Sequence, residues 1–306
     1  SKAWRSRGEV LEVDLQVTSK TSASSISNVE AMTHAPTITT TSTLPAGHEW
    51  KEAGAAWGRR SRDWACLFEH YASDVIQAIF PRVGVEPGTS VLDIACGSGL
   101  AVRLADGVGA STAGIDAASD LIDIARDRAP DADLRVGTMF ELPWDDESFD
   151  AVTSINGIWG GCDAALDEAF RVLRPGGRIG ISFWGRGHLD LRPCFEAFAL
   201  NAPESHVEGM RRTNSIARPG AAEQMLEAAG FAVTERGGRI STLEWPDEET
   251  AWRAMASVGP AVPALEHVGA DVLRPQVLAA MATIQDRHGI YRFRNDHQFV
   301  IAAKPH

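Results

Sequence analysis

A carboxylate followed by two glycines at the end of an apolar run is the feature of this sequence that most directly suggests chemistry. It lies in VLDIACGSGL, residues 91–100, where Asp93 interrupts a pattern typical of a buried strand. Gly97 and Gly99 allow the backbone to approach a ligand closely, and the free amides at the start of the next helix suit a carboxylate or phosphate. Asp93 itself repels phosphate and attracts a cation. The stretch therefore favours a ligand that carries positive charge over a pyrophosphate.

The glycine pattern also differs from the dinucleotide fingerprint G-x-G-x-x-G. Ala95 precedes the two glycines, and Val102 stands where a third glycine belongs. An NAD(P)-dependent oxidoreductase would share the fold class predicted below, but it would need that third glycine and a hydride-transfer site. It remains as an alternative hypothesis.

Strand and helix patterns alternate along the chain around this stretch. The predicted strands are SVLDIA, STAGID, LRVGT, FDAVTSIN, RIGISFWG, FAVTERGGRI and HQFVIAAK, and the helical patterns between them include GLAVRLADGV, ASDLIDIARDRA, CDAALDEAFRVL, AAEQMLEAAG and residues 248–288. This alternation predicts an α/β fold, a doubly wound, mostly parallel, seven-stranded sheet with helices on both faces. Ligands of such sheets bind beyond the carboxyl ends of the strands, which is where Asp93 and the glycines stand.

The first 45 residues differ in composition from the rest of the chain. Ser, Thr and Ala dominate them, so we expect residues 1–45 to form a disordered tail and residues 46–306 to form the folded domain. Apolar residues between 64 and 79 fall at helical spacing, and Pro81 is expected to close that helix. Residues 46–80 are therefore predicted to form an N-terminal cap.

Composition excludes several classes of partner. The 306 residues carry a formal charge of −12, which disfavours nucleic acid because phosphate binding needs clustered Lys and Arg. The longest apolar runs are too short to span a membrane. The cysteines, Cys66, Cys96, Cys162 and Cys194, are far apart and lack zinc-ligand spacing, so we expect no metal site, reduced thiols and a cytoplasmic protein. A homodimer is left open.

Four segments in order resemble motifs of the class I S-adenosylmethionine-dependent methyltransferases, especially the ubiquinone-biosynthesis or type 11 branch. VLDIACGSG resembles the first motif, D-x-G-x-G-x-G, with Ala95 in place of the first glycine. The other three are AGIDAAS, VGTMFELPWDDESFDAV and EAFRVLRPGGRIGIS. The resemblance covers about residues 85 to 185 and extends more loosely to the end of the chain.

The resemblance implies S-adenosylmethionine as cofactor, with S-adenosylhomocysteine as product. Asp93 and the glycine loop would hold its methionine part, Asp116 would accept hydrogen bonds from both ribose hydroxyls, and Asn156 would face the reacting methyl group. The segment from Thr138 would flank adenine, although the family usually has Asp where Thr138 stands. The cofactor residues implied in this way are Asp93, Ala95, Gly97, Gly99, Asp116, Ala117, Thr138, Met139, Phe140 and Asn156.

The acceptor site is less readable. In the family it is built from the N-terminal cap and from insertions that here correspond to residues 185–218 and 245–288. These surroundings carry the predicted pocket residues Trp57, Trp64, Trp159 and Trp184, which suggest a small aromatic or lipid-like acceptor, although aromatic residues at helical spacing also suit a core. His188 is the first candidate for a general base, with an ordinary surface histidine as the alternative.

The leading hypothesis is therefore methyl transfer to an oxygen, nitrogen or carbon nucleophile of such a metabolite. A non-catalytic protein that binds S-adenosylmethionine is the second alternative. It would keep the cofactor residues without a working acceptor pocket.

Overall fold

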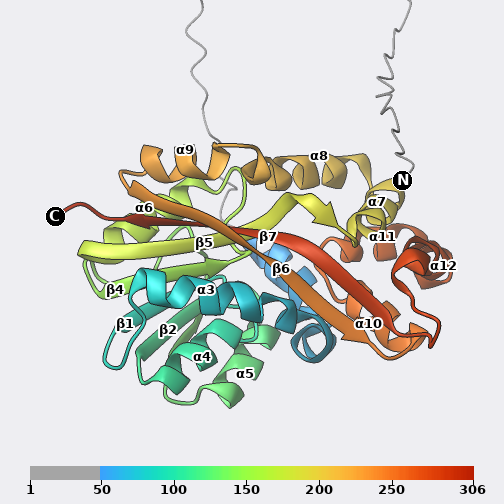
Figure 1. Cartoon of the computed structure of the whole chain (residues 1–306), viewed down its shortest axis with the longest axis horizontal. Helices are drawn as coiled ribbons and strands as arrows, with labels where there is room; N and C mark the ends of the chain where they lie inside the picture. The colour runs from blue at the N-terminus through green and yellow to red at the C-terminus, as the bar shows by residue number, and fades with distance from the viewer. Residues whose placement is uncertain (1–48) are drawn as a thin grey trace, which may run out of the picture. The chain divides into compact units, whose positions relative to one another are not determined.

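The computed structural model describes residues 49–306, and the tail predicted over 1–45 lies outside them. Within the described part, seven strands form one sheet in the order β3-β2-β1-β4-β5-β7-β6 (Figure 1). The strands are β1 Ser90–Ile94, β2 Ser111–Asp116, β3 Asp133–Val136, β4 Phe149–Ile155, β5 Leu173–Leu189, β6 Ala232–Trp245 and β7 Tyr291–Ala303. Neighbours from β3 to β5 pair in parallel, and β7 runs antiparallel to both β5 and β6. The predicted doubly wound, mostly parallel α/β fold is confirmed.

Helices cover both faces of this sheet. They are α3 Ser73–Val83, α4 Leu100–Val108, α5 Ser119–Arg128, α6 Asp163–Val172 and α9 Ala221–Ala228 (Figure 1). α3 and α4 belong to one apolar cluster and α6 and α9 to another. Val300 and Ile301, adjacent in β7, belong to different clusters. Because successive side chains of a strand point to opposite faces, the two clusters lie on opposite sides of the sheet.

The N-terminal segment is helical but irregular, which corrects one prediction. α1 Glu49–Gly58 and α2 Ser61–Asp63 lead into a π-helical turn, η1 Trp64–Phe68, a 3₁₀ turn, η2 Glu69–Ala72, and then α3. Pro81 does not close the helix: α3 continues to Val83 and ends at Gly84, whose φ is +83°. A proline costs a helix one hydrogen bond. That loss is tolerated in the last turn, where Phe80 and Val83 are buried.

Helical segments follow β5 and β6, and residues 185–189 of the first predicted insertion still belong to β5. The first contains α7 Arg192–Asn201, α8 Glu204–Thr213 and η3 Asn214–Ala217, and the second contains α10 Glu248–Ala256, α11 Ala261–Val268, α12 Ala270–Ala280 and η4 Ala282–Ile284. β6 and β7 are longer than predicted, since they pair with each other as far as Trp245 and Tyr291. Both of these side chains are buried in the cluster that holds α10 to α12.

None of the helices in residues 49–306 is both long enough and apolar enough to cross a membrane.

Candidate active site

Asp116 connects the end of β2 to the glycine loop after β1. Its Oδ2 accepts a hydrogen bond from the Gly97 amide at 2.8 Å, and its Oδ1 accepts one from the Ala118 amide at 2.8 Å. Gly97 and Gly99 have φ values of +54° and +80°, in the left-handed region that glycine adopts without strain. Burial raises the pKa of Asp116. A carboxylate has about four acceptor positions, so Asp116 can hold the loop and still accept from a ligand.

Asp93 lies beneath this loop and is buried. Its Oδ1 accepts a hydrogen bond from Thr153 Oγ1 of β4 at 2.7 Å. Burial raises the pKa of Asp93 to about 7. This hydrogen bond connects β1 to β4. The binding of the methionine part of a cofactor by Asp93 stays a prediction.

Ala95 occupies a backbone conformation that favours glycine. Its φ is +58°, and Asn156 after β4 has a φ of +55°. The two turns touch, because a Cβ built on Gly157 would lie 2.7 Å from Ser154 Oγ and would also collide with Ala95 Cβ. Left-handed backbone costs a non-glycine residue roughly 1–2 kcal/mol. A strained alanine therefore packs against the turn after β4 at the carboxyl edge of the sheet, where ligands of this fold class bind.

Asn156 has polar partners on three sides. Its Nδ2 donates to the Tyr71 hydroxyl at 2.8 Å, its backbone amide donates to Ser182 Oγ at 3.2 Å, and its carbonyl accepts from Trp159 Nε1 at 2.6 Å. Its Oδ1 is buried and has no hydrogen-bond partner within residues 49–306. A buried amide oxygen without a donor is costly. Asn156 Oδ1 is therefore available to accept a hydrogen bond, and Asn156 is the residue predicted to face the reacting methyl group.

His297 is a buried polar residue that the sequence analysis missed. Its ring lies between Ser241 Oγ, 2.9 Å from Nδ1, and Ser182 Oγ, 3.1 Å from Nε2. Burial lowers its pKa to about 3, so the ring is neutral at pH 7 and must donate through one nitrogen and accept through the other. The two-residue period that His297 shares with Phe299 and Ile301 in β7 was the available signal. Through Ser182, His297 supports the strained turn at Asn156.

An aromatic cluster connects the N-terminal segment to β5. Trp64 lies edge-on to Trp57 with ring centroids 5.0 Å apart and to Tyr71 at 6.2 Å, and Tyr71 lies 4.6 Å from Trp184. Three of the four predicted pocket tryptophans therefore come together, with Tyr71 completing the cluster. The fourth, Trp159, packs on the opposite apolar cluster beside Asn156.

The segment after β3 contains Thr138, Met139 and Phe140, and their predicted contact with adenine stays a prediction. Thr138, Met139 and Phe140 are half-buried at the carboxyl edge, and Met139 and Phe140 pack on the apolar cluster that contains α6. Thr138 Oγ1 accepts from the Phe140 amide at 3.3 Å. Ala117, beside Asp116, is approached by α1 so closely that a Cβ on Gly54 would collide with its carbonyl oxygen.

His188 makes its side-chain contact with a different residue, Asp190. It is in the last part of β5, its side chain is 62% exposed, and its Nε2 lies 2.7 Å from Asp190 Oδ1. No hydrogen bond within residues 49–306 joins His188 to the glycine loop or to Asn156. Its assignment as general base stays a prediction.

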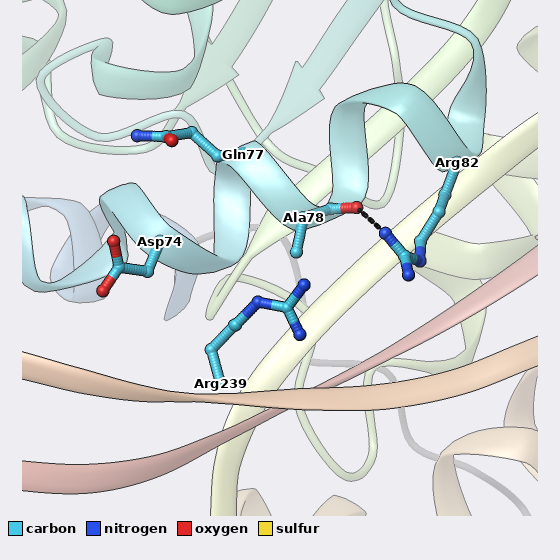
Figure 2. A pocket seen from close by; sticks show the side chains of 5 residues that line it. All are labelled: Asp74, Gln77, Ala78, Arg82 and Arg239. Carbon is cyan, nitrogen blue, oxygen red and sulfur yellow. Dashed lines mark hydrogen bonds between the residues drawn. The ribbon is translucent and has the colours of Figure 1, made fainter.

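One open cavity of about 340 Å³ lies between α3 and β6. Figure 2 shows its lining residues, with the Arg82 guanidinium bonded to the Ala78 carbonyl oxygen at 2.8 Å and Arg239 projecting from β6. Arg82 also donates to Glu235 at 2.8 Å. The residues that line this cavity include none of the predicted site residues. We therefore place the candidate site at the strand ends instead.

Part of the chain is similar to known methyltransferases. Residues 91–177 match the family model described as a methyltransferase domain. An uncharacterized protein of Mycobacterium tuberculosis is 31% identical over 159 residues, which are 48% of this chain and 58% of that protein. The 2-phytyl-1,4-naphtoquinone methyltransferase of a Nostoc strain is 33% identical over 151 residues, 46% of this chain and 65% of that enzyme. The chain thus spans less than two thirds of the length of either relative.

The fold also has a counterpart among solved structures. The crystal structure of a Bacillus halodurans protein that is proposed to be a methyltransferase superposes with a TM-score of 0.52, covering 76% of this chain and all of that one, at 17% sequence identity. At this low identity the similarity establishes the shared fold and does not extend to substrate.

Proposed function

We propose that the protein is a class I methyltransferase that takes S-adenosylmethionine as its cofactor and transfers a methyl group to an oxygen, nitrogen or carbon nucleophile of a small aromatic or lipid-like metabolite. The match of residues 91–177 to a methyltransferase domain supports this proposal. The observation that carries the proposal is the hydrogen bond from the Gly97 amide of the glycine loop to Asp116. It brings a carboxylate and the glycine loop together at the carboxyl edge of the sheet.

The groups around this loop fit the proposed cofactor chemically. The cofactor carries ribose hydroxyls, an ammonium, a carboxylate and a flat adenine. The chain offers the Asp116 carboxylate for hydroxyls and the half-buried Phe140 for a planar ring. When bound, the cofactor supplies an already activated methyl group. An NAD(P)-dependent oxidoreductase is disfavoured by the family match and by Val102, where a third glycine would be needed.

The protein's own contribution to such a reaction is alignment of the two reactants. Alignment is worth up to about 7–11 kcal/mol in well-oriented intramolecular reactions. Asn156 is held by Ser182 and Tyr71, so its free Oδ1 has a fixed direction. It can accept a hydrogen bond from an N–H or O–H group of the substrate to be methylated. Burial keeps the pKa of Tyr71 above its ordinary value, and its neutral hydroxyl accepts the hydrogen bond from Asn156 Nδ2.

The chemical type of the acceptor and the location of the protein are supported by its aromatic residues, cysteines and charge. The aromatic cluster supports an acceptor with an apolar or aromatic body, since Trp57, Trp64 and Trp184 lie beside Tyr71. The four free cysteines support a reducing, cytoplasmic location. The acceptor is proposed to be a small molecule and not a nucleic acid, because the net charge is −12. The protein could work as a monomer or a homodimer.

A screen for acceptor-dependent product tests the proposal. The protein is incubated with S-adenosylmethionine and each of a set of phenols, naphthoquinols, aromatic amines and long-chain acids, and S-adenosylhomocysteine is quantified by mass spectrometry. We expect release above background with at least one aromatic or lipid-like acceptor. Binding of the cofactor without release for any acceptor would instead favour a non-catalytic cofactor-binding protein.

A further inference from the structure

Two side chains of the N-terminal segment converge on the glycine loop. A Cβ built on Gly97 would lie 3.7 Å from Trp64 Nε1 and 3.8 Å from Glu69 Oε1, which are ordinary van der Waals distances. Trp64 begins η1 and Glu69 begins η2. A hydrogen-bond donor and a carboxylate therefore flank one point of the loop, and both come from outside the matched domain at residues 91–177.

Trp64 Nε1 is a buried donor without an acceptor within residues 49–306. An indole N–H can only donate, and leaving a buried donor unpaired costs roughly 1–3 kcal/mol. The ring itself is held by its neighbours, since it stacks on Phe68 with centroids 5.3 Å apart and meets Trp57 edge-on. Trp64 thus presents a fixed N–H that lacks an oxygen partner.

Glu69 is also fixed, and within residues 49–306 only one of its oxygens accepts a hydrogen bond. Its side chain is buried, and Oε2 accepts from Arg128 Nη1 at 2.6 Å. The same guanidinium donates to the Ser98 carbonyl at 3.0 Å and to the Ala65 carbonyl at 2.9 Å. Arg128 therefore connects α5, the glycine loop and η1, and it holds Glu69 with Oε1 on the side of Gly97.

We propose that Trp64 and Glu69 bind the amino-acid end of the cofactor, with Trp64 Nε1–H donating to its carboxylate and Glu69 Oε1 accepting from its ammonium. This inference rests on the proposed function. A zwitterionic amino acid carries both groups on one carbon, which suits a donor and a carboxylate that flank one point. It also gives Trp64 a role at the cofactor besides its ring contacts in the aromatic cluster.

Ligand truncation tests the inference on the full chain. Wild type, Trp64→Phe and Glu69→Gln are titrated by calorimetry with S-adenosylhomocysteine and with 5′-methylthioadenosine, which keeps the nucleoside and lacks the amino-acid end. Because hydrogen bonds to charged groups are involved, each variant should bind S-adenosylhomocysteine about 10-fold or more weakly. Affinity for 5′-methylthioadenosine should change less than about 3-fold. The control Glu52→Gln removes an exposed carboxylate of α1 and should bind both ligands as wild type does.

The outcomes separate this inference from the proposed function. If wild type binds neither nucleoside, the proposed cofactor is wrong and the inference falls with it. If wild type binds S-adenosylhomocysteine and Trp64→Phe binds both ligands equally well, or loses affinity for both equally, the inference alone is overturned. Trp64→Phe keeps an aromatic ring in place, so it remains informative if Glu69→Gln leaves Arg128 unpaired and lowers the melting temperature.

Discussion

Asn156 Nδ2, at the end of β4, donates a hydrogen bond to the hydroxyl of Tyr71 in the N-terminal segment at 2.8 Å. The two residues are far apart in sequence, and their contact joins the strand end to the cap. Tyr71 is buried and Asn156 is half-buried, and the Tyr71 ring also packs at a tilt against the His297 ring with centroids 5.6 Å apart. This hydrogen bond therefore helps to fix the end of β4 against the N-terminal segment.

Removal of the Tyr71 hydroxyl should destabilise the fold measurably. In Tyr71→Phe the Asn156 amide loses its acceptor, so we expect the free energy of unfolding to fall by about 1–2 kcal/mol. Urea denaturation measures it. The matched control is Tyr291→Phe, at the only other tyrosine, whose hydroxyl makes no hydrogen bond within residues 49–306. Equal losses in the two variants would contradict a specific role of the Tyr71 bond.

Asp116→Asn should weaken cofactor binding. An amide nitrogen at one of its oxygen positions would face the Gly97 or Ala118 amide, so one hydrogen bond becomes a repulsion and the glycine loop shifts. We expect affinity for S-adenosylhomocysteine to fall about 10-fold or more. Asp127→Asn, at an exposed position of α5, is the control and should bind as wild type does. Unchanged binding by Asp116→Asn would show that the ribose site lies elsewhere.

Two buried groups should give opposite pH dependences of stability. Burial lowers the pKa of His297 to about 3 from 6.5, so its contribution to stability is lost as pH falls below about 6.5. Burial raises the pKa of Asp93 to about 7 from 3.8, so its contribution is lost as pH rises above about 4. Between about pH 4.5 and 6.5 the two slopes, each roughly 1 kcal/mol per pH unit, oppose each other.

Replacing either group should reveal the slope of the other. Relative to wild type, His297→Gln should lose stability as pH rises from about 4.5 to 6.5, and Asp93→Asn should gain it, by roughly 1 kcal/mol per pH unit. Urea denaturation across this range measures both differences. If stability depended on pH in the same way in wild type and in both variants, neither the pKa of His297 nor that of Asp93 would be shifted as their burial implies.

Ala95→Gly should not destabilise the protein, although it removes a side chain. At a φ of +58° the glycine relieves strain, and this gain offsets the greater freedom of glycine in the unfolded chain. We expect the free energy of unfolding to stay unchanged or rise by up to about 1 kcal/mol. Ala55→Gly, on the exposed face of α1, should instead lower it by about 1 kcal/mol. If Ala95→Gly lowered the free energy of unfolding as much as Ala55→Gly does, the backbone of Ala95 would not be strained.

The motif-bearing half of the fold was predictable because its signals are local. Strand β1 and the loop after it combine an apolar run with Gly97 and Gly99, whose positive φ values the sequence suggests by residue type alone. Asp116 follows from the same pattern, since it ends the next strand. These elements need no knowledge of distant contacts.

The cap side was less predictable because tertiary contacts shape it. The π-helical turn at Trp64–Phe68 sits where a regular helix was expected, and its geometry accompanies packing of Phe68 against Trp245, about 180 residues away in sequence. The full lengths of β6 and β7 come from their pairing with each other. His297 was missed because its partners, Ser182 and Ser241, come from two other strands.

The central claim, that the strand ends hold S-adenosylmethionine, is tested most directly by calorimetric titration of the full chain with S-adenosylmethionine, S-adenosylhomocysteine and NADH in parallel. The account predicts micromolar binding of the first two, one ligand per chain, and no binding of NADH. Binding of NADH alone would contradict it.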